Sequence, residues 1–196
     1  MSATLAVPVS QRFHDALAYA STLHATQARK GAEIPYIAHL LAVASIVMEA
    51  GGNEDEAIAA LLHDGPEDQG GQKTLAEVRR QFGDTVADIV EGCSDSFDDP
   101  KPPWEDRKSA YIEHLRKTDP STLLVSASDK LHNARATVRD LREHGASVWA
   151  RFSATREQTL NNYRQLVDAY ERGSKDDRRM GIIHELRDLL GQMERA

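Results

Sequence analysis

The stretch LLHDGPED, residues 61–68, places a leucine pair next to one imidazole and three carboxylic acids. Carboxylates crowded beside an apolar segment lose hydration and repel one another, so they are unfavourable unless a positive charge lies among them. The stretch also contains helix-ending signals, because Pro66 disfavours helical geometry at residue 65 and glycine commonly follows a helix end. It therefore predicts the end of a helix and a cation near that end.

The residues on both sides of this stretch carry helix-start signals. Asn53 is a preferred N-cap residue, and Glu56 three positions later completes the pattern of a capping box. A helix is therefore predicted over residues 53–64. Thr74 and Glu77 repeat the pattern and predict the start of the next helix.

Apolar residues recur at intervals of three and four along most of the chain. This spacing is typical of helices that bury one face, and no alternating stretch requires a sheet. We therefore predict an all-α fold of about eight or more helices. The further helices are expected at residues 10 to about 29, 37–48, 86–90, about 105–117, 121 to about 143, 155–171 and 178–193, with a proline-rich loop at 96–106.

The composition of the 196 residues, 40% hydrophobic and 28% charged, suits a globular protein. The net charge of −7 argues against nucleic acid or an anionic membrane as the partner. No run of about 18 apolar residues and no leader-like N-terminus is present, so we expect no membrane segment and no signal peptide. Cys93 is the single cysteine, which excludes an intrachain disulfide and favours a cytoplasmic location.

Residues of metal-binding types occur on three predicted helices. His39 begins an apolar helical face, His63 and Asp64 end another helix, and Asp129 lies in an otherwise apolar run. Two imidazoles with two carboxylates suit Mn²⁺, Fe²⁺, Zn²⁺ or Co²⁺. Only the fold can unite these residues, and each has an alternative role, His39 as a core histidine and Asp129 as a partner of Lys130. Together they would explain the crowding at Asp64, because a metal ion inverts the local electrostatics.

Five segments in this order resemble one family. PYIAHLLAV (35–43), ALLHDGPED (60–68) and SDKLHNAR (128–135) resemble the metal-ligand motifs of the HD phosphohydrolase superfamily. More narrowly, they are similar to the hydrolase domain of Rel/SpoT-type alarmone enzymes and to the small alarmone hydrolases. HATQARKG (24–31) resembles the basic segment of that family, and QFGDTVADIVEGCSD (81–95) resembles the helix before its variable loop.

The resemblance implies a reaction and a cofactor. The reaction is removal of the 3′-pyrophosphate from guanosine tetra- or pentaphosphate to give GDP or GTP, and the adenosine counterparts are further candidate substrates. The cofactor is one divalent metal, Mn²⁺ foremost and another divalent transition metal as the alternative. The ligands implied by the motifs are His39, His63, Asp64 and Asp129.

The resemblance also implies roles for residues around the metal. Glu67 and Asp68 are expected to face the attacking water, and either of them is a candidate general base. Asn133 lies four residues after Asp129 and so shares its helical face. Lys130 is rotated by about 100° around the helix axis from Asp129, and its ammonium reaches phosphate only if the lysine side chain bends. The residues predicted to bind the substrate are Arg29, Lys30, Lys108, Lys130 and Asn133.

The sequence departs from the family pattern in places that bear on substrate rather than metal. Gly65-Pro66 replaces two residues that are usually not glycine, and Ala136 stands where a threonine is common. These departures leave the choice between guanine and adenine open. The loop at 96–106 is expected either at the substrate rim or as a solvated loop with its tryptophan on the core. The rim candidates are Lys101, Trp104, Arg107 and Lys108.

We expect one HD hydrolase domain over residues 1–196, with a core at about 10–145 and closing helices at about 146–196. The roughly 50 residues after the core are too few for a synthetase domain. Two other functions fit the same residues: a broader HD nucleotide phosphohydrolase, and a non-catalytic nucleotide-binding protein. The Glu67-Asp68 pair argues against the non-catalytic binding protein, because binding alone needs no water-activating pair. The predicted partner is a small purine nucleotide, and homo-oligomerisation is left open.

Overall fold

The computed structural model describes residues 9–97, 100–173 and 177–196. Within these ranges the regular structure is helical, apart from an isolated antiparallel bridge between Ala28 and Pro35, so the all-α prediction is confirmed. The α-helices are α1 (Gln11–Leu23), α2 (Ile37–Glu49), α3 (Glu54–Leu62), α4 (Gly65–Asp68), α5 (Gln72–Phe82), α6 (Asp84–Cys93), α7 (Trp104–Leu115), α8 (Pro120–His144), α9 (Arg156–Arg172) and α10 (Met180–Arg195), with 3-10 segments η1 (Gly145–Arg151) and η2 (Asp177–Arg179).

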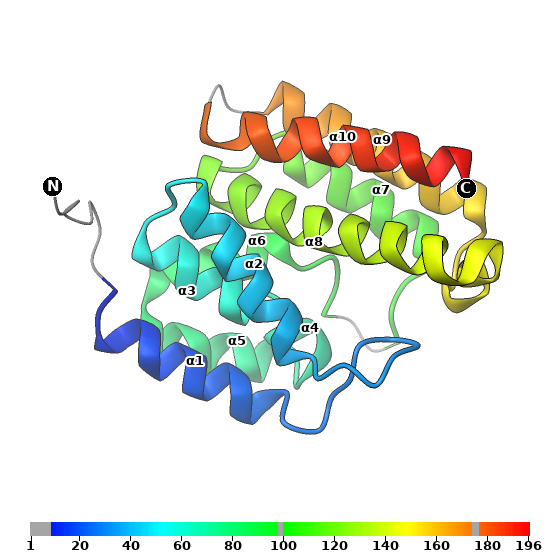
Figure 1. Cartoon of the computed structure of the whole chain (residues 1–196). Helices are drawn as coiled ribbons and strands as arrows, with labels where there is room; N and C mark the ends of the chain where they lie inside the picture. Colours follow the sequence, from blue (N-terminus) through cyan, green and yellow to red (C-terminus); the bar gives the residue numbers. More distant parts are fainter. Residues whose placement is uncertain (1–8, 98–99, 174–176) are drawn as a thin grey trace, which may run out of the picture.

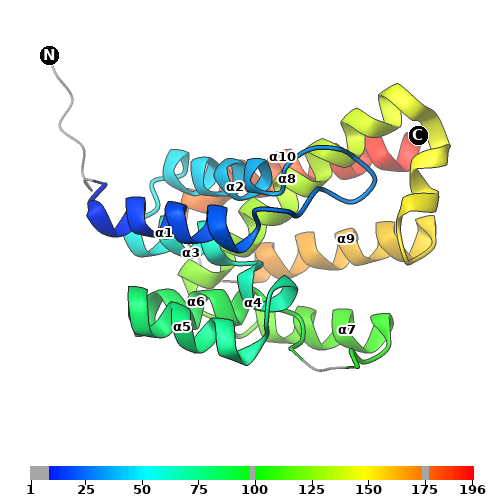
Figure 2. The same ribbon diagram turned by 90° about the horizontal axis from the view of Figure 1, so that it is seen from below.

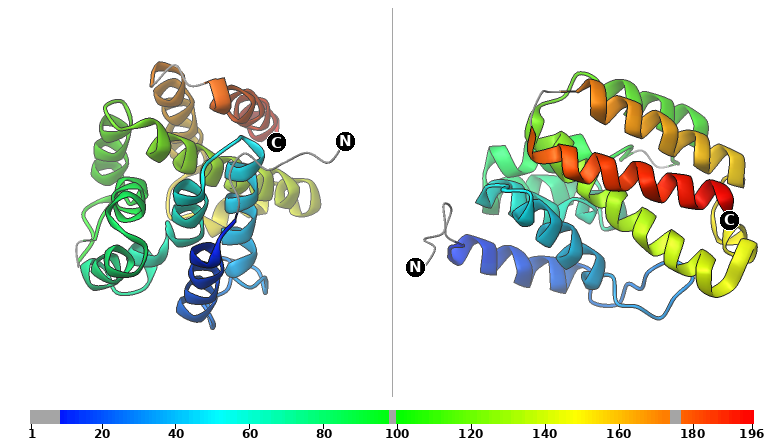
Figure 3. Two further views of the ribbon diagram at one scale, coloured as in Figure 1. Left: turned by 90° about the vertical axis from the view of Figure 1, so that its left-hand side faces the viewer. Right: turned by 45° about the horizontal axis from the view of Figure 1, so that its top comes forward.

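The longest helix, α8, runs through the middle of the molecule (Figure 1). Helices α2, α3, α6 and α10 pack against it, and α10 also packs against α9. Seen from below, α1, α2 and α3 lie above α5 and α6, with α4 and α7 on the same lower side (Figure 2). Figure 3 shows α10 crossing the molecule beside α8. The elements that meet α8 thus come from both ends of the sequence.

Helix α3 is held firmly at both ends. The Asn53 side-chain oxygen accepts from the Glu56 backbone N–H at 3.0 Å, and Glu56 Oε2 accepts from the Asn53 N–H at 2.7 Å, so the predicted capping box is present. Leu61 and Leu62 are buried in the core on the last turn. His63, the next residue, keeps helical backbone angles, so its ring projects from the buried end of the helix.

The predicted helix end is confirmed, because α3 stops at Leu62, but the chain does not form an open turn at Gly65-Pro66. Asp64 has near-helical angles, and residues 65–68 make a short helix, α4, with Pro66 in its first turn. Pro66 fits there because the first helical N–H groups have no intrahelical acceptor to lose. The sharp change of direction comes later, at Gly70 and Gly71, whose φ angles of 101° and 59° favour glycine.

The second capping box is also wrong. Helix α5 begins at Gln72 with Gly71 as its N-cap, and no side chain caps it. Thr74 lies inside the helix, and its hydroxyl donates back to the Gln69 carbonyl. The Thr74 hydroxyl therefore bonds a carbonyl that precedes the helix and does not cap the helix start.

The first helix is shorter than its apolar pattern predicts. It ends at Leu23, and His24 then bonds to the Gln27 side chain at 2.7 Å. The chain from there to α2 is a loop, in which the Arg29 N–H donates to the Ile34 carbonyl at 2.8 Å. This loop places basic residues beside the start of α2 and not on a helix face.

The proline-rich loop precedes α7, which starts at Trp104, one residue before the predicted boundary. Residues 98 and 99 of that loop lie outside the described ranges. None of the helices in the described ranges combines the length and the apolar character that crossing a bilayer requires.

Candidate metal centre and adjoining pocket

Four residues from three helix ends and one helix centre meet beside α8. His39 comes from the first turn of α2, His63 and Asp64 from the link between α3 and α4, and Asp129 from the middle of α8. His39 Nε2 lies 3.2 Å from Asp129 Oδ1 and 3.4 Å from Asp64 Oδ2. His63 Nε2 lies 3.0 Å from Asp64 Oδ2 and 3.7 Å from Asp129 Oδ1. The structure thus brings together the four residues that the sequence grouped as metal ligands.

The donor atoms of this cluster converge on one buried point. One atom each of His39, His63 and Asp129 lies within 4.8 Å of the others, and these three side chains are buried. His39 Nε2 and His63 Nε2 are buried and have no hydrogen-bond partner among the described residues. Two unpartnered imidazole nitrogens beside two carboxylates form the donor set that a divalent transition metal prefers.

The hydrogen bond on the far side of His63 fixes which nitrogen is available. Its Nδ1 lies 2.8 Å from the Ala60 carbonyl, which can only accept, so Nδ1 carries the proton. In the neutral ring the lone pair is therefore on Nε2, the atom that faces the carboxylates. This tautomer is the one that metal binding through Nε2 requires.

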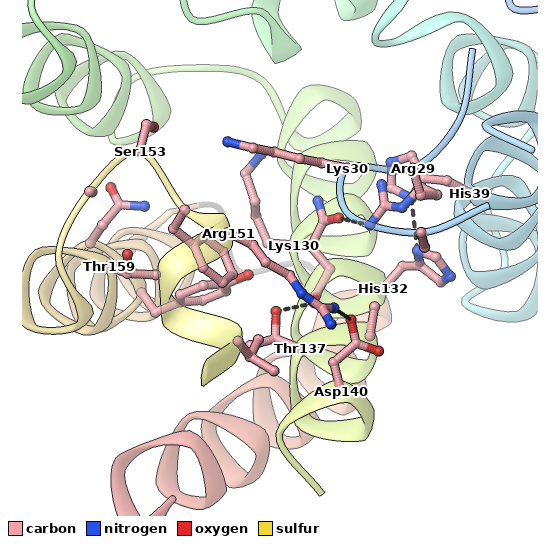
Figure 4. A pocket seen from close by; sticks show the side chains of 18 of the residues that line it. Arg29, Lys30, His39, Lys130, His132, Thr137, Asp140, Arg151, Ser153 and Thr159 are labelled. Atoms are coloured by element: carbon pink, nitrogen blue, oxygen red, sulfur yellow. Dashed lines mark hydrogen bonds and ion pairs between the residues drawn. The ribbon is translucent and has the colours of Figure 1, made fainter. Parts of the chain in front are cut away.

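His132 plays the corresponding role for His39. Their Nδ1 atoms are 2.7 Å apart, so one ring donates and the other accepts (Figure 4). Burial, reinforced by the nearby His39 and Arg29, lowers the pKa of His132 to about 4, so it is neutral and able to accept at neutral pH. In the tautomer that metal binding requires, His39 donates from Nδ1 to His132 and keeps its Nε2 lone pair toward Asp129. His132 lies three residues after Asp129 in the sequence, and only the fold shows that its ring meets His39.

The carboxylates are oriented by their own partners. The Tyr36 hydroxyl donates to Asp64 Oδ2 at 2.6 Å. The Asn133 amide donates to Asp129 Oδ1 and the Lys130 ammonium to Oδ2, each at 2.5 Å. Each of the four candidate ligands is therefore held by a second group, an arrangement common around protein-bound metals.

The electrostatics of the cluster show how strongly it favours positive charge. Burial opposes ionisation of Asp129, yet Lys130 and the two histidines hold the pKa of Asp129 well below its usual value. Burial likewise opposes a charged His63, but Asp64 and Asp129 outweigh it and hold the pKa of His63 well above its usual value. A divalent cation offers the same compensation without a proton, so the residues fit a metal.

Glu67 and Asp68 lie on α4, next to this cluster but engaged elsewhere. Glu67 Oε1 accepts from the Lys101 ammonium at 2.9 Å, and Asp68 Oδ2 accepts from the Gln27 amide at 2.7 Å. Burial and the charge of Asp95 raise the pKa of Glu67, while Lys101 opposes that shift. A carboxylate with a raised pKa is better matched to accept a proton near neutral pH.

A pocket of about 460 Å³ adjoins the cluster at His39. All five predicted substrate residues line it, but several already have partners: the Arg29 guanidinium donates to the Asn133 side-chain oxygen at 2.6 Å, and the Lys108 ammonium to Asp95 at 2.5 Å. Figure 4 shows Arg29 and Lys30 on the same side of the pocket as Lys130 and His132. One side of the pocket is therefore basic and lies next to the candidate metal centre.

The opposite wall of the pocket comes from η1 and α9. Val148, Phe152 and Leu166 supply apolar surface there, and Arg151 is fixed by an ion pair with Asp140 at 3.1 Å. No local sequence pattern marks η1 as facing a site, so the place of η1 on this wall follows only from the fold. Of the rim candidates from the proline-rich loop and α7, Trp104 and Lys108 line the pocket, Lys101 bonds Glu67, and Arg107 pairs with Asp95.

Comparisons with known proteins agree on one family. The model of the HD domain family matches residues 16–160. Guanosine-3′,5′-bis(diphosphate) 3′-pyrophosphohydrolase MESH1 of Xenopus tropicalis is 35% identical over 162 residues, covering 81% of this chain and 82% of that protein. The bifunctional (p)ppGpp synthase/hydrolase SpoT of Escherichia coli K12 is 36% identical over 131 residues, which is 64% of this chain but 18% of SpoT.

Solved structures are similar over most of this chain. A metazoan ortholog of SpoT, described as hydrolysing ppGpp and acting in starvation responses, has a TM-score of 0.75 and 28% identity, covering 95% of this chain and 98% of that one. The protein lmo0812 of Listeria monocytogenes EGD-e has a TM-score of 0.72 and 29% identity, covering 81% of this chain and 99% of that one. The likeness therefore includes the closing helices as well as the ligand-bearing core.

Proposed function

The chain belongs to the HD domain family, and on this premise we propose that it is a metal-dependent hydrolase that removes the 3′-pyrophosphate of guanosine tetra- and pentaphosphate. The relative MESH1, which this chain matches over 82% of its length, carries that activity in its name. The products would be pyrophosphate with GDP or GTP.

The observation that carries the proposal is the pair of unpartnered imidazole nitrogens. His39 Nε2 and His63 Nε2 are buried and face Asp64 and Asp129 at 3.0–3.7 Å, and the His39 side chain also lines a pocket with a basic side. These four residues would hold the metal, and we propose Mn²⁺ because two imidazoles and two carboxylates suit it. When bound, the metal would supply a Lewis acid and lower the pKa of water at the site to about 7.

The basic residues of the pocket would bind the phosphates. Lys130 is held against Asp129 and also lies over the Tyr111 ring at 5.7 Å, so its ammonium is fixed at the boundary between the ligand cluster and the pocket. Lys30 is exposed and lies near Lys130 on the same side of the pocket. Arg29 reaches Asn133, which in turn holds Asp129. Phosphate binding at Arg29 would thus be linked to the position of a metal ligand.

Glu67 would act as the general base. Water would attack the phosphorus attached to the 3′-oxygen, the bond from that phosphorus to the 3′-oxygen would break, and the departing 3′-oxygen would take up a proton from solvent, so that the nucleoside keeps a 3′-hydroxyl. Glu67 would accept the proton that the water loses, since burial raises the pKa of Glu67 towards the working range. Asp68, anchored by Gln27, would hold α4 in place beside the site.

Several finer properties belong to the same proposal. The adenosine counterparts would be poorer substrates of the same site. Residues 1–196 would act as one hydrolase domain without a synthetase activity. The lone Cys93, partly buried, is compatible with a reducing cytoplasmic location.

Product analysis tests the proposal. Purified protein is incubated with guanosine tetraphosphate, with and without Mn²⁺, and the products are separated. Pyrophosphate and GDP, formed only with metal, are expected. Inorganic phosphate alone, or turnover limited to other nucleotides, would indicate the broader nucleotide phosphohydrolase. Tight binding without turnover would indicate a nucleotide-binding protein.

A further inference from the structure

Two polar atoms at the α9 wall of the pocket lack hydrogen-bond partners. Thr159 Oγ1 and Asn162 Oδ1 are buried and unpartnered among the described residues, and both side chains line the pocket. Thr159 is 6% exposed. Buried hydroxyl and amide oxygens are nearly always paired, so two unpaired ones on one wall require an explanation.

Neighbouring polar groups show that the fold normally satisfies such atoms. The Thr137 hydroxyl, also on the pocket wall, donates to the Asn133 carbonyl at 2.9 Å. In the core between α7, α8 and α9, the Ser126 hydroxyl bonds both the Tyr111 and the Tyr170 hydroxyls, at 2.6 and 2.7 Å. Thr159 could return its hydroxyl to the preceding helical turn as Thr137 does, but it does not. Its rotamer leaves the hydroxyl available to a ligand.

The two atoms share one helical face because they are three residues apart on α9. Leu166, on the same wall, and Phe152 and Val148 from the segment around η1 add apolar surface beside them. In Figure 4, Thr159 lies across the pocket from His39, while Arg29 and Lys30 lie on the His39 side. A ligand with phosphates at the basic side would thus present its other end to Thr159 and Asn162.

Resting on the function proposed above, we propose that Thr159 and Asn162 read the edge of the purine base and favour guanine. The apolar wall can pack against the flat face of the purine, and the two polar atoms can form hydrogen bonds with the polar groups on its edge. The Asn162 oxygen is an acceptor, and guanine presents two adjacent donors, N1–H and the 2-amino group. Adenine presents a single donor group, the 6-amino group. The Thr159 hydroxyl can donate to the guanine O6 or N7.

Steady-state kinetics with the two tetraphosphates test this. The unmodified protein should have the higher kcat/KM for the guanosine compound. Asn162→Leu should raise KM for that compound by about three- to tenfold, with kcat nearly unchanged, because a uniform binding contact is lost. KM for the adenosine compound should change less, so the preference falls. Thr159→Val should act in the same direction with a smaller change.

Two further variants keep the test decisive. Asn161→Leu makes the same replacement on the exposed neighbouring residue and should leave KM unchanged. Asn162→Asp keeps an acceptor oxygen at the same reach and should retain the guanosine preference even if the leucine variant does not fold. An Asn162→Leu protein with unaltered KM and preference, or an unmodified protein that prefers the adenosine compound, would overturn the assignment.

The base assignment and the reaction can fail separately. If neither tetraphosphate is hydrolysed, the proposed function is wrong, and GDP binding by calorimetry then tests the base assignment alone. A weaker affinity of Asn162→Leu for GDP, relative to Asn161→Leu, would still support it. Equal affinities would reject it.

Discussion

The two halves of LLHDGPED are held in different ways. His63 and Asp64 are fixed by groups from well-packed elements: the Ala60 carbonyl for His63, and Tyr36, just before α2, for Asp64. Glu67 and Asp68 are held from loops, by Lys101 and Gln27. The candidate ligands are therefore preorganised by the core, whereas the candidate base depends on surface segments. Metal binding and water activation should accordingly respond to different mutations.

Loss of a ligand should have the largest effect. Asp64→Ala removes the carboxylate oxygen nearest to His63 Nε2, so bound Mn²⁺ and hydrolysis should both be lost. Elemental analysis after loading and desalting measures the metal. Asp88→Ala, at an exposed position on α6, is the matched control and should keep both. Metal retained at the normal level in Asp64→Ala would contradict the ligand assignment.

Loss of the base should separate the two halves. Glu67→Gln should keep the metal but lower kcat by about 10²- to 10⁴-fold, the usual contribution of a general base. Asp68→Asn should cost less, because Asp68 bonds Gln27 and not the site. A larger loss in Asp68→Asn than in Glu67→Gln would reverse the roles given to the two acids.

Variants at His132 test whether metal binding depends on the residue that orients the ligand His39. His132→Ala should weaken Mn²⁺ binding by about 10- to 100-fold, since the acceptor that fixes the His39 tautomer is removed. His132→Asn, whose side-chain oxygen can accept from His39 Nδ1–H, should recover part of that affinity. The comparison is made by metal titration of the stripped protein. Equal affinities in all three proteins would show that His132 has no part in orienting His39.

Lys101 should produce the smallest change, visible mainly in the pH profile. Burial raises the pKa of Glu67 and Lys101 opposes this, so Lys101→Ala should raise that pKa further. A base works when deprotonated, and its activity is lost as pH falls through its pKa. The acid limb of log kcat/KM should therefore move to higher pH, with little change on the plateau. Lys73→Ala, at an exposed site on α5, is the control, and a shift to lower pH in Lys101→Ala would contradict the ion pair.

The sequence predicted those parts of the molecule that depend on local signals. The capping box of α3 and the limits of α2 and α8 follow from residues a few positions apart. The HD motifs grouped the four candidate ligands because their order along the chain resembles a known family, and the HD domain family is confirmed. Spacing alone would not have grouped them.

The failures arose where contacts are distant or where glycines changed the chain direction. His39 and His132 are 93 residues apart, and no local pattern indicates that their rings meet. Thr74 resembled a cap, but the turn at Gly70 and Gly71 moved the helix start to Gln72. Gly65 resembled a helix stop, but the chain continued into another helical turn there. The place of η1 on the pocket wall has no local sequence signal, because packing and not sequence pattern fixes its position.

The central claim is that His39, His63, Asp64 and Asp129 hold one divalent metal without help from Glu67 or Asp68. Anomalous scattering from crystals of the protein grown with Mn²⁺ tests it most directly. We expect a single manganese peak bonded to the two Nε2 atoms and to one oxygen of each aspartate, in the unmodified protein and in Glu67→Gln alike. A peak bonded to Glu67 or Asp68 instead, or none at the four residues, would contradict it.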